Sequence, residues 1–177
     1  MNNNRKVVLY IAMSLDGYIA KPNDDLSFLN IVEKEGEDYG YSAFISTVDT
    51  VILGRKTYDW VTAQVDFPHA DKESYVITRT PKPSMGRTLF YTGNLKDLIN
   101  DLKNKEGKNI FCDGGAVLVN ELLKEQLIDE LIISVIPILV GEGKKLFVEG
   151  NPEQKLQLSS VKNYDTGLVQ LHYKKVY

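Results

Sequence analysis

The most informative stretch of the chain is Asn109-Ile110-Phe111-Cys112-Asp113-Gly114-Gly115-Ala116-Val117-Leu118-Val119-Asn120-Glu121-Leu122-Leu123. A short apolar run of strand-forming residues stops at two glycines, and an apolar pattern with helical spacing begins directly behind them. The stretch therefore predicts a strand over 109–112, a tight turn and a helix. Because Gly114 and Gly115 carry no side chain, backbone N–H groups at the helix start can approach an anion. A pyrophosphate would suit this turn, although paired glycines also serve purely structural needs there.

Strands and helices alternate on both sides of this turn. The nearly continuous apolar run from Val7 to Met13 indicates a strand that is covered on both faces. Alternation of this kind predicts parallel strands joined by right-handed crossovers. From the apolar periodicity we expect strands at 7–13, 49–53, 74–78, 88–91 and 109–112, and helices at 25–32, 39–48, from 55 onward and at 95–105.

The last third of the chain has a different pattern. A long strand is expected at 130–137, and a glycine-bracketed loop follows it at 138–147. Two further strands, at 155–161 and 168–176, are joined by a short hairpin-like connection, so they should pair antiparallel. We therefore predict an α/β fold with a mostly parallel, mixed sheet and antiparallel C-terminal strands. Residues 1–177 contain no repeat or composition break, which predicts one domain.

Composition excludes several function classes. The formal net charge of -3 argues against a protein that binds nucleic acid through a broad basic surface. The single cysteine and the two distant histidines offer no metal-site spacing, so no metal is expected. The first apolar run is too short to span a bilayer and lacks a signal-peptide cleavage pattern. We therefore expect a cytoplasmic protein that does not interact with membranes.

Positive charges stand at two of the expected strand ends. Arg55 and Lys56 begin a helix directly after the strand at 49–53, at the sheet edge where open α/β proteins place their ligands. Cations at the positive end of a helix dipole are unfavourable unless an anion is present. Arg79 stands between two hydroxyl residues, Thr78 and Thr80, after the strand at 74–78. Together these positions predict phosphate binding.

Four motifs in order resemble one known superfamily. They are Met13-Ser14-Leu15-Asp16-Gly17-Tyr18-Ile19-Ala20, Ile52-Leu53-Gly54-Arg55-Lys56-Thr57-Tyr58, Asp113-Gly114-Gly115-Ala116 and Ile136-Pro137-Ile138-Leu139-Val140-Gly141-Glu142-Gly143. The series is similar to the dihydrofolate reductase-like superfamily, and within it to bacterial proteins related to the reductase domain of riboflavin biosynthesis. The resemblance runs from about Val7 to Val176, and four ordered motifs are far more specific than one.

The resemblance implies a three-layer α/β/α fold that binds NADPH. Gly54-Arg55-Lys56-Thr57 matches the motif that contacts cofactor phosphates, and the Thr78 loop falls where the adenosine 2′-phosphate is bound. A guanidinium facing that phosphate would select NADPH over NADH. The residues expected to bind the cofactor are Met13, Ser14, Gly54, Arg55, Lys56, Thr57, Thr78, Arg79, Thr80, Asp113, Gly114, Gly115, Ala116 and Val117.

Two carboxylates are candidates for the catalytic role. Hydride transfer requires that two rings be held in contact and that one proton be supplied. Asp16 lies in the Ser-Leu-Asp-Gly motif, and Asp25 lies where dihydrofolate reductases place an acidic residue that binds the pterin ring. Asp25 is equally suited to cap a helix, and Asp16 to cap a turn. The choice between the two stays open.

Several other side chains have structural interpretations at this stage. Cys112 is expected to be a small buried hydrophobe, since no histidine accompanies it. Trp60 and Tyr58 should pack into the core, whereas His69, beside Pro68, should lie on the surface and at most line the substrate opening.

The substrate is less well defined than the cofactor. Riboflavin-pathway reductases usually continue the Ser-Leu-Asp-Gly motif with a cation that suits a ribose phosphate, but Tyr18 stands there in this chain. The Pro-Trp pair of dihydrofolate reductases is also missing. The leading hypothesis is an NADPH-dependent reductase of a small pterin-like or pyrimidine-like heterocycle. The alternative is a non-catalytic nucleotide-binding or sensor protein on the same fold, and homodimerisation is expected to be possible in either case.

Overall fold

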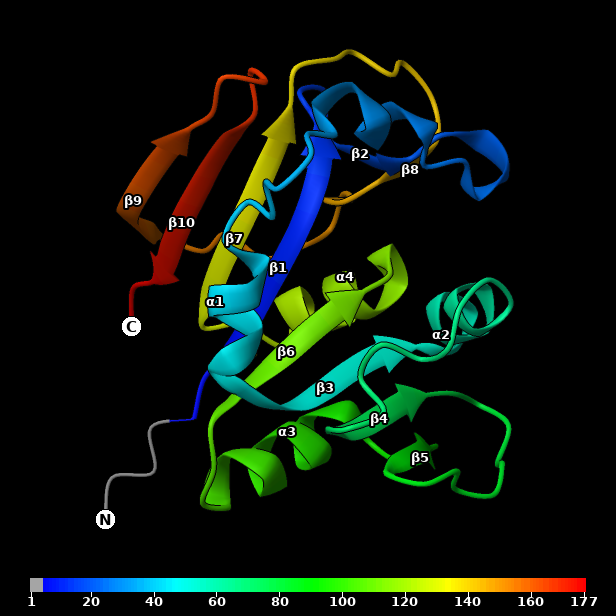
Figure 1. The fold of residues 1–177 in the computed structure, drawn as a ribbon. Helices are drawn as coiled ribbons and strands as arrows, with labels where there is room; N and C mark the ends of the chain where they lie inside the picture. Colours follow the sequence, from blue (N-terminus) through cyan, green and yellow to red (C-terminus); the bar gives the residue numbers. More distant parts are fainter. Residues whose placement is uncertain (1–4) are drawn as a thin grey trace.

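The computed structural model describes residues 5–177, and in it strands alternate with helices along most of the chain (Figure 1). The elements are β1 (Val7–Ser14), β2 (Tyr18–Ala20), η1 (Pro22–Asp24), η2 (Ser27–Val32), α1 (Tyr41–Ser46), β3 (Val48–Gly54), α2 (Arg55–Thr62), β4 (Glu73–Ile77), β5 (Thr88–Tyr91), α3 (Leu95–Asn104), β6 (Asn109–Gly114), α4 (Ala116–Lys124), β7 (Glu130–Ile136), β8 (Lys144–Lys145), β9 (Leu156–Asn163) and β10 (Val169–Lys175).

The main sheet is mixed, as predicted. Within residues 5–177 its eight strands have the order β5-β4-β3-β6-β1-β7-β10-β9. The pairs from β5 to β7 are parallel, whereas β10 pairs antiparallel with both β7 and β9. The carboxyl ends of the parallel strands therefore meet at one edge of the sheet, and the loops that follow them are neighbours in space.

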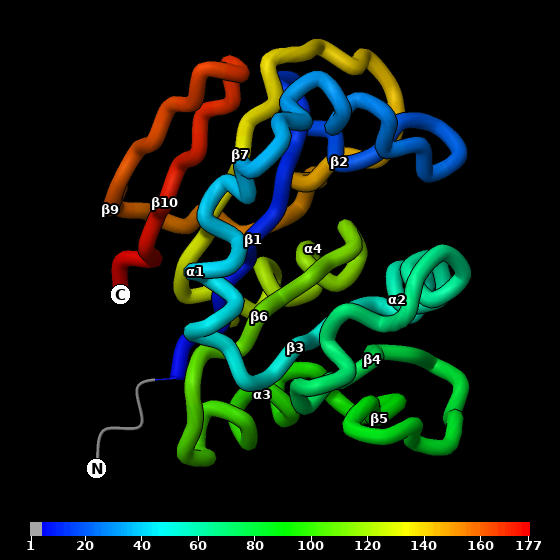
Figure 2. Tube along the Cα trace, viewed as in Figure 1, coloured from blue at the N-terminus to red at the C-terminus, as the bar shows by residue number. Residues whose placement is uncertain are grey.

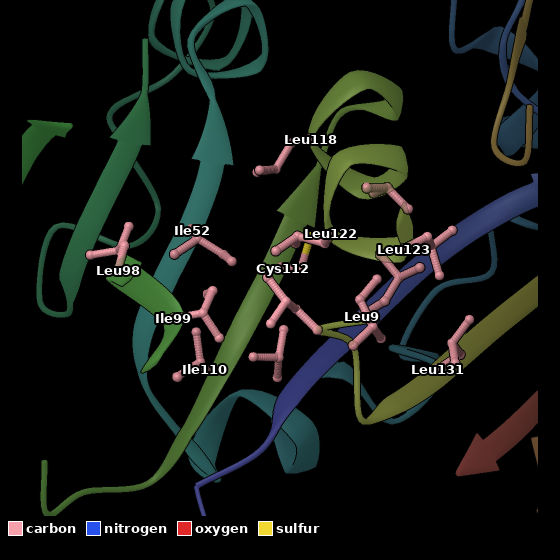
Figure 3. Packing of buried hydrophobic residues seen from close by; sticks show 14 of the residues in the cluster. Leu9, Ile52, Leu98, Ile99, Ile110, Cys112, Leu118, Leu122, Leu123 and Leu131 are labelled. Carbon is pink, nitrogen blue, oxygen red and sulfur yellow. The ribbon is translucent and has the colours of Figure 1, made fainter. Parts of the chain in front are cut away.

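Helices cover both faces of the sheet, which confirms the three-layer α/β/α architecture. Val7 and Leu9 of β1 pack in a core that includes α3 and α4, whereas Val8 packs on the opposite face with α1 and α2. Figure 3 shows the first of these cores, with Ile52 and Ile110 of the sheet facing Ile99 of α3. Alternate residues of one strand are thus buried on both sides, which explains the unbroken apolar runs in the sequence.

Three expected elements differ in the structure. The helix predicted at 39–48 is only α1, because Tyr39 and Gly40 have φ angles of 55° and 85° and Val48 already belongs to β3. The helix predicted at 25–32 is instead the 3-10 helix η2, whose N-cap residue is Leu26. The loop predicted at 138–147 contains the short strand β8, which pairs antiparallel with β2.

This loop is fastened to the end of β1. Figure 2 shows the segment after β7 running beside the turn between β1 and β2. The amide of Leu15 donates to the Ile138 carbonyl, and the amide of Leu146 donates to the Gly17 carbonyl, both at 2.9 Å. A Cβ at Gly143 would lie 2.1 Å from the Ala20 carbonyl oxygen, so only glycine allows this close approach.

The C-terminal hairpin leaves an exposed strand at the sheet edge. All eight residues of β9 are exposed, including Leu156, Leu158 and Val161. The expected homodimer stays a prediction. Over residues 5–177, none of the helices combines the length and the apolar character needed to span a membrane.

Candidate functional site

The turns that follow β3 and β6 lie against each other at the carboxyl edge of the sheet. These two strands pair in parallel, and Leu53 registers with Gly114. A Cβ built on Gly54 would lie 3.7 Å from the Gly114 carbonyl oxygen and the Gly115 nitrogen. A Cβ on Gly115 would lie only 3.1 Å from Thr57 Oγ1. The structure thus brings together two of the motifs that are far apart in the sequence.

The two adjacent glycines are required for different reasons. Gly114 has a φ of 94°, in the left-handed region that side chains disfavour. Gly115 has φ -77° and ψ -167°, a conformation that any residue adopts. At Gly115 the observed constraint is space: a side chain there would enter the narrow gap beside Thr57.

Two helix N-termini open onto this gap without a side-chain cap. Helices α2 and α4 begin directly after Gly54 and Gly115, and neither cap residue makes a side-chain hydrogen bond (Figure 1). Helix α3, by contrast, is capped by Asn94, whose side chain accepts from the amides of Lys96 and Asp97. The first amides of α2 and α4 thus present the positive ends of two helix dipoles to an anion.

Cations extend the row of strand ends toward β4. Gly54 registers with Ile77, so the loop of Thr78 and Arg79 follows beside the start of α2. The Arg55 guanidinium donates to both carboxylate oxygens of Asp59 at 2.7 Å, and it lies 5.7 Å from the Phe90 ring centroid. Lys82 Nζ lies 5.5 Å from the same centroid. Cationic groups and an aromatic ring therefore lie next to the two helix N-termini.

The loop after β4 is ordered by its own hydroxyl groups. Thr78 Oγ1 accepts from the Thr80 amide at 3.1 Å and donates to the Thr80 carbonyl at 3.2 Å. Lys56, Arg79 and Val117 are exposed, while Arg55 and Thr57 are half-buried. The sequence predicted these residues to bind a cofactor, and the structure aligns them along one edge of the sheet.

At the end of β1, Met13 and Ser14 face opposite sides of the sheet. Met13 packs against the core on the side of α3 and α4, and Ser14 is fully buried. Ser14 Oγ donates to Asp16 Oδ1 at 2.5 Å and accepts from the Tyr18 amide at 2.9 Å. Ser14 therefore orders the turn that carries Asp16.

The Asp16 carboxylate anchors the loop that follows β7. Asp16 Oδ1 accepts from the Val140 amide at 3.0 Å, and Oδ2 accepts from the Gly141 amide at 2.7 Å. The hydrogen bonds from Ser14, Val140 and Gly141 lower the pKa of Asp16 to about 2. The group is therefore ionised at neutral pH, with its oxygens directed at donors of the protein itself.

This anchoring predicts a pH dependence in the loop. A pKa lowered from 3.8 to about 2 means that the carboxylate stabilises the folded loop fully above pH 4 and loses this effect as pH falls through about 2. We expect Asp16→Asn to lower the amide-exchange protection of Val140 and Gly141 at pH 6. Asp165→Asn, at an exposed ion pair with Lys34, serves as the control and should leave both amides unchanged. Equal protection in Asp16→Asn and the wild type would contradict the anchoring role.

Asp25, the other candidate carboxylate, lies on the surface with its side chain 49% exposed. It accepts from the amide of Ser27 at 2.8 Å and from the Ser27 hydroxyl at 3.0 Å. These hydrogen bonds, with a smaller contribution from Lys21, lower its pKa. Asp25 thus orders the start of η2.

A cavity of about 530 Å³ lies next to the end of β1, on the face of the sheet that carries η2. Neither Asp16 nor Asp25 lines it. Ala12 immediately precedes Met13, and Ile136 registers with Ser14, so the cavity borders the row of strand ends. Its walls are Tyr10, Ala12, Leu29, Asn30, Val32, Glu33, Lys34, Glu37, Asp38, Tyr39, Ser134, Ile136 and Leu168.

A buried hydrogen-bond network holds one wall of the cavity. Gln170 Nε2 lies 3.1 Å from each of three acceptors: Tyr10 Oη, the Tyr39 carbonyl and Ser134 Oγ. The Tyr10 hydroxyl donates to the same Tyr39 carbonyl at 2.9 Å, and burial raises the pKa of Tyr10. This network joins β1, β7 and β10 to the segment before α1, so the wall is held by hydrogen bonds within the protein itself.

His69 is buried, which contradicts its predicted surface position. Its ring packs edge-on against Phe67 and Phe111, and Nε2 lies 3.5 Å from Asp113 Oδ2. No periodic pattern in the sequence indicates this placement, since His69 lies in a loop without regular structure. The histidine connects the loop after α2 to the residue directly before Gly114.

Of the three other side-chain predictions, those for Cys112 and Tyr58 are confirmed and the one for Trp60 is wrong. Cys112 is fully buried, and burial raises the pKa of its thiol to about 12, so it is no nucleophile. Tyr58 packs in the core as predicted. Trp60 was expected beside it but is 42% exposed, because it lies on the outer face of α2.

Known proteins share this fold and sequence pattern. Residues 5–170 match the model of the RibD C-terminal domain family. The chain is 47% identical to the uncharacterized protein YwjB of Bacillus subtilis over 171 residues, which cover 96% of this chain and 97% of that protein. A crystal structure of a putative riboflavin biosynthesis protein from Shewanella is 31% identical, with a TM-score of 0.89 over 97% of this chain and 99% of the other.

Two more distant structures show the same fold at lower identity. One is a diaminohydroxyphosphoribosylaminopyrimidine deaminase/5-amino-6-(5-phosphoribosylamino)uracil reductase from Thermotoga maritima, at 13% identity and a TM-score of 0.73, covering 97% of this chain and 57% of the other. The other is a dihydrofolate reductase from Enterococcus faecalis complexed with NADP(H), at 15% identity and a TM-score of 0.65, covering 100% of this chain and 99% of that one.

Proposed function

The chain belongs to the RibD C-terminal domain family, and from this we propose that it is an NADPH-dependent reductase of a small heterocyclic substrate. The observation that carries the proposal is the contact between the Gly115 turn and Thr57, where two uncapped helix N-termini meet. The dihydrofolate reductase named above, which has the same fold, is complexed with NADP(H).

The residues along the strand ends fit such a cofactor. The amides at the starts of α2 and α4 would hold the pyrophosphate, with Thr57 between them. The exposed guanidinium of Arg79 would face the 2′-phosphate, and Phe90 offers an aromatic surface beside Arg55 and Lys82. The bound cofactor would supply the hydride. Residues of the chain then have to orient the substrate and exclude water.

We propose the cavity beside Ala12 as the substrate site. Its apolar walls would bury a flat ring, and the Gln170 network would keep Tyr10 and Ser134 in fixed positions. Since Asp16 is held by amides of the loop after β7, we propose that it is a positioning residue, which keeps that loop at the end of β1.

The cofactor assignment is tested by thermal stabilisation. At a concentration of 100 times its Kd, NADPH should raise the Tm of the protein by roughly 5–11 °C, and NADH at the same concentration by much less. Arg79→Ala should weaken NADPH about tenfold and leave NADH unchanged, because one charge-assisted contact to the 2′-phosphate is lost. Arg87→Ala, which removes another exposed arginine at the opposite end of the sheet, is the control.

The outcomes of this experiment separate the possibilities. Equal stabilisation by NADPH and NADH would contradict the 2′-phosphate contact. No stabilisation by either would contradict the reductase proposal. Stabilisation by NADPH without NADPH oxidation across dihydrofolate, pyrimidine and quinone-like substrates would favour a non-catalytic sensor.

A further inference from the structure

The solvent-accessible charged residues that line the proposed substrate cavity, here called its mouth, are mostly acidic. Four charged residues line it, the carboxylates Glu33, Glu37 and Asp38 and the amine Lys34, so the carboxylates exceed the cations by two. Lys34 Nζ lies 2.7 Å from Asp165 Oδ2, which is outside the lining. The only cation of the lining is therefore already neutralised by a carboxylate of its own protein.

The hydrogen bonds of the three carboxylates leave them without a neutralising partner within residues 5–177. The hydrogen bond from the Ser42 side chain, followed by those from the amides of Ser42 and Gly40, lowers the pKa of Asp38, so it is ionised at neutral pH. Glu37 accepts from the Tyr39 amide at 2.8 Å through one oxygen. The backbone amide of Glu33 donates to the Asn30 carbonyl at 3.1 Å, but its side chain is exposed and makes no hydrogen bond or ion pair with the residues from 5 to 177. Within residues 5–177 none of these three carboxylates forms an ion pair with a cation, and Lys34 interacts with Glu37 only at longer range.

Cations are instead concentrated along the strand ends. Arg55, Lys56, Arg79 and Lys82 all lie near the starts of α2 and the loop after β4, and none of them lines the cavity. The protein thus offers phosphate-binding chemistry to the proposed cofactor and the opposite charge to whatever occupies the cavity.

We propose that the cavity takes a neutral or cationic aromatic heterocycle that carries no phosphate group, and that Glu33 and Glu37 exclude phosphorylated analogues. This inference rests on the proposed function, because it treats the cavity as the substrate site. On this proposal the substrate of the chain differs from that named for the Thermotoga maritima reductase, which carries a 5-phosphoribosylamino group. Unpaired carboxylates would repel a phosphorylated ligand, and they would do so without removing any contact to an unphosphorylated one.

The experiment compares matched ligands that differ only by a phosphate. One pair is 5-amino-6-(5-phosphoribosylamino)uracil before and after phosphatase treatment, and the other is neopterin 3′-phosphate and neopterin. Affinity for the full-length protein, saturated with NADP+, is measured by calorimetry at low ionic strength, where charge repulsion is least screened. For any pair in which binding is detected, the unphosphorylated compound should bind at least tenfold more tightly than its phosphorylated counterpart.

Two variants assign the discrimination to the mouth. The double variant Glu33→Gln/Glu37→Gln keeps the shape of the side chains and should reduce the tenfold preference to about threefold or less. Glu35→Gln is the matched control, because Glu35 is an exposed carboxylate of the same segment that does not line the cavity. It should leave the preference unchanged.

Equal or tighter binding of the phosphorylated member of either pair would overturn the proposal, and so would the failure of all four compounds to bind. An unchanged preference in the double variant would overturn the role of Glu33 and Glu37. These results are distinguishable from a failure of the proposed function, because stabilisation by NADPH is measured separately with no heterocycle present.

Discussion

Replacement of Arg5 by methionine is expected to lower the free energy of unfolding by about 3 kcal/mol or more. The Arg5 side chain is 2% exposed and lies at the edge of the sheet opposite the candidate site. Its guanidinium donates to Asp49 Oδ1 at 2.5 Å and to Thr50 Oγ1 at 2.7 Å. It also donates to two backbone carbonyls, those of Lys108 at 2.7 Å and Leu102 at 3.0 Å.

The expected cost arises because four acceptors lose one donor group together. Methionine fills part of the same volume but satisfies none of them. The Asp49 side chain is 38% exposed and also accepts a hydrogen bond from the Lys108 amide. Water and this amide can therefore replace part of the hydrogen bonding that Asp49 loses with Arg5. For this reason the expected loss of unfolding free energy lies at the lower end of the range of about 3–5 kcal/mol for breaking a buried ion pair.

Urea denaturation followed by circular dichroism measures the effect, with Lys34→Met as the control. Lys34 forms an ion pair with Asp165 in which both side chains are largely exposed, so its loss should not change the midpoint measurably. A midpoint for Arg5→Met equal to that of the wild type would show that the Arg5 cluster does not stabilise the fold.

The parallel part of the sheet was predictable because one physical pattern specifies it. Strands such as β1 and β3 are buried on both faces, so their apolar runs are nearly continuous and end abruptly at glycine or polar residues. The same endings placed Gly54, Arg79 and Gly115 at one sheet edge, since parallel strands align their carboxyl ends. The positions of the candidate site residues followed from the topology.

Features that depend on contacts between distant loops were not predictable in the same way. His69 is buried because Phe67 and Phe111 surround it, and only Phe111 lies in a periodic element. Asp16 has an environment set by Val140 and Gly141, more than 120 residues away. The acidic mouth depends on Glu33 and Glu37, which in the sequence are part of an ordinary charged connection.

Replacement of Gly115 by valine is expected to weaken NADPH binding at least 100-fold while the protein remains folded. The φ of Gly115 lies outside the left-handed region, so valine meets no left-handed strain there. The side chain would instead enter the gap toward Thr57, where a Cβ alone lies 3.1 Å from Oγ1, and would cover amides at the start of α4. Since these amides are the proposed pyrophosphate donors, cofactor affinity should fall far more than stability.

A smaller substitution separates crowding by Thr57 from exclusion of the cofactor. Gly115→Ala brings its Cβ against Thr57, and Thr57→Ala in the same chain removes the Oγ1 atom that it meets. If only this contact mattered, the double variant would recover both the wild-type urea midpoint and the NADPH affinity measured by fluorescence. We expect recovery of the midpoint but not of the affinity, because the methyl group still occupies the approach to the amides and the Thr57 hydroxyl is gone. Wild-type NADPH affinity in Gly115→Val would contradict the assignment of this turn to the pyrophosphate.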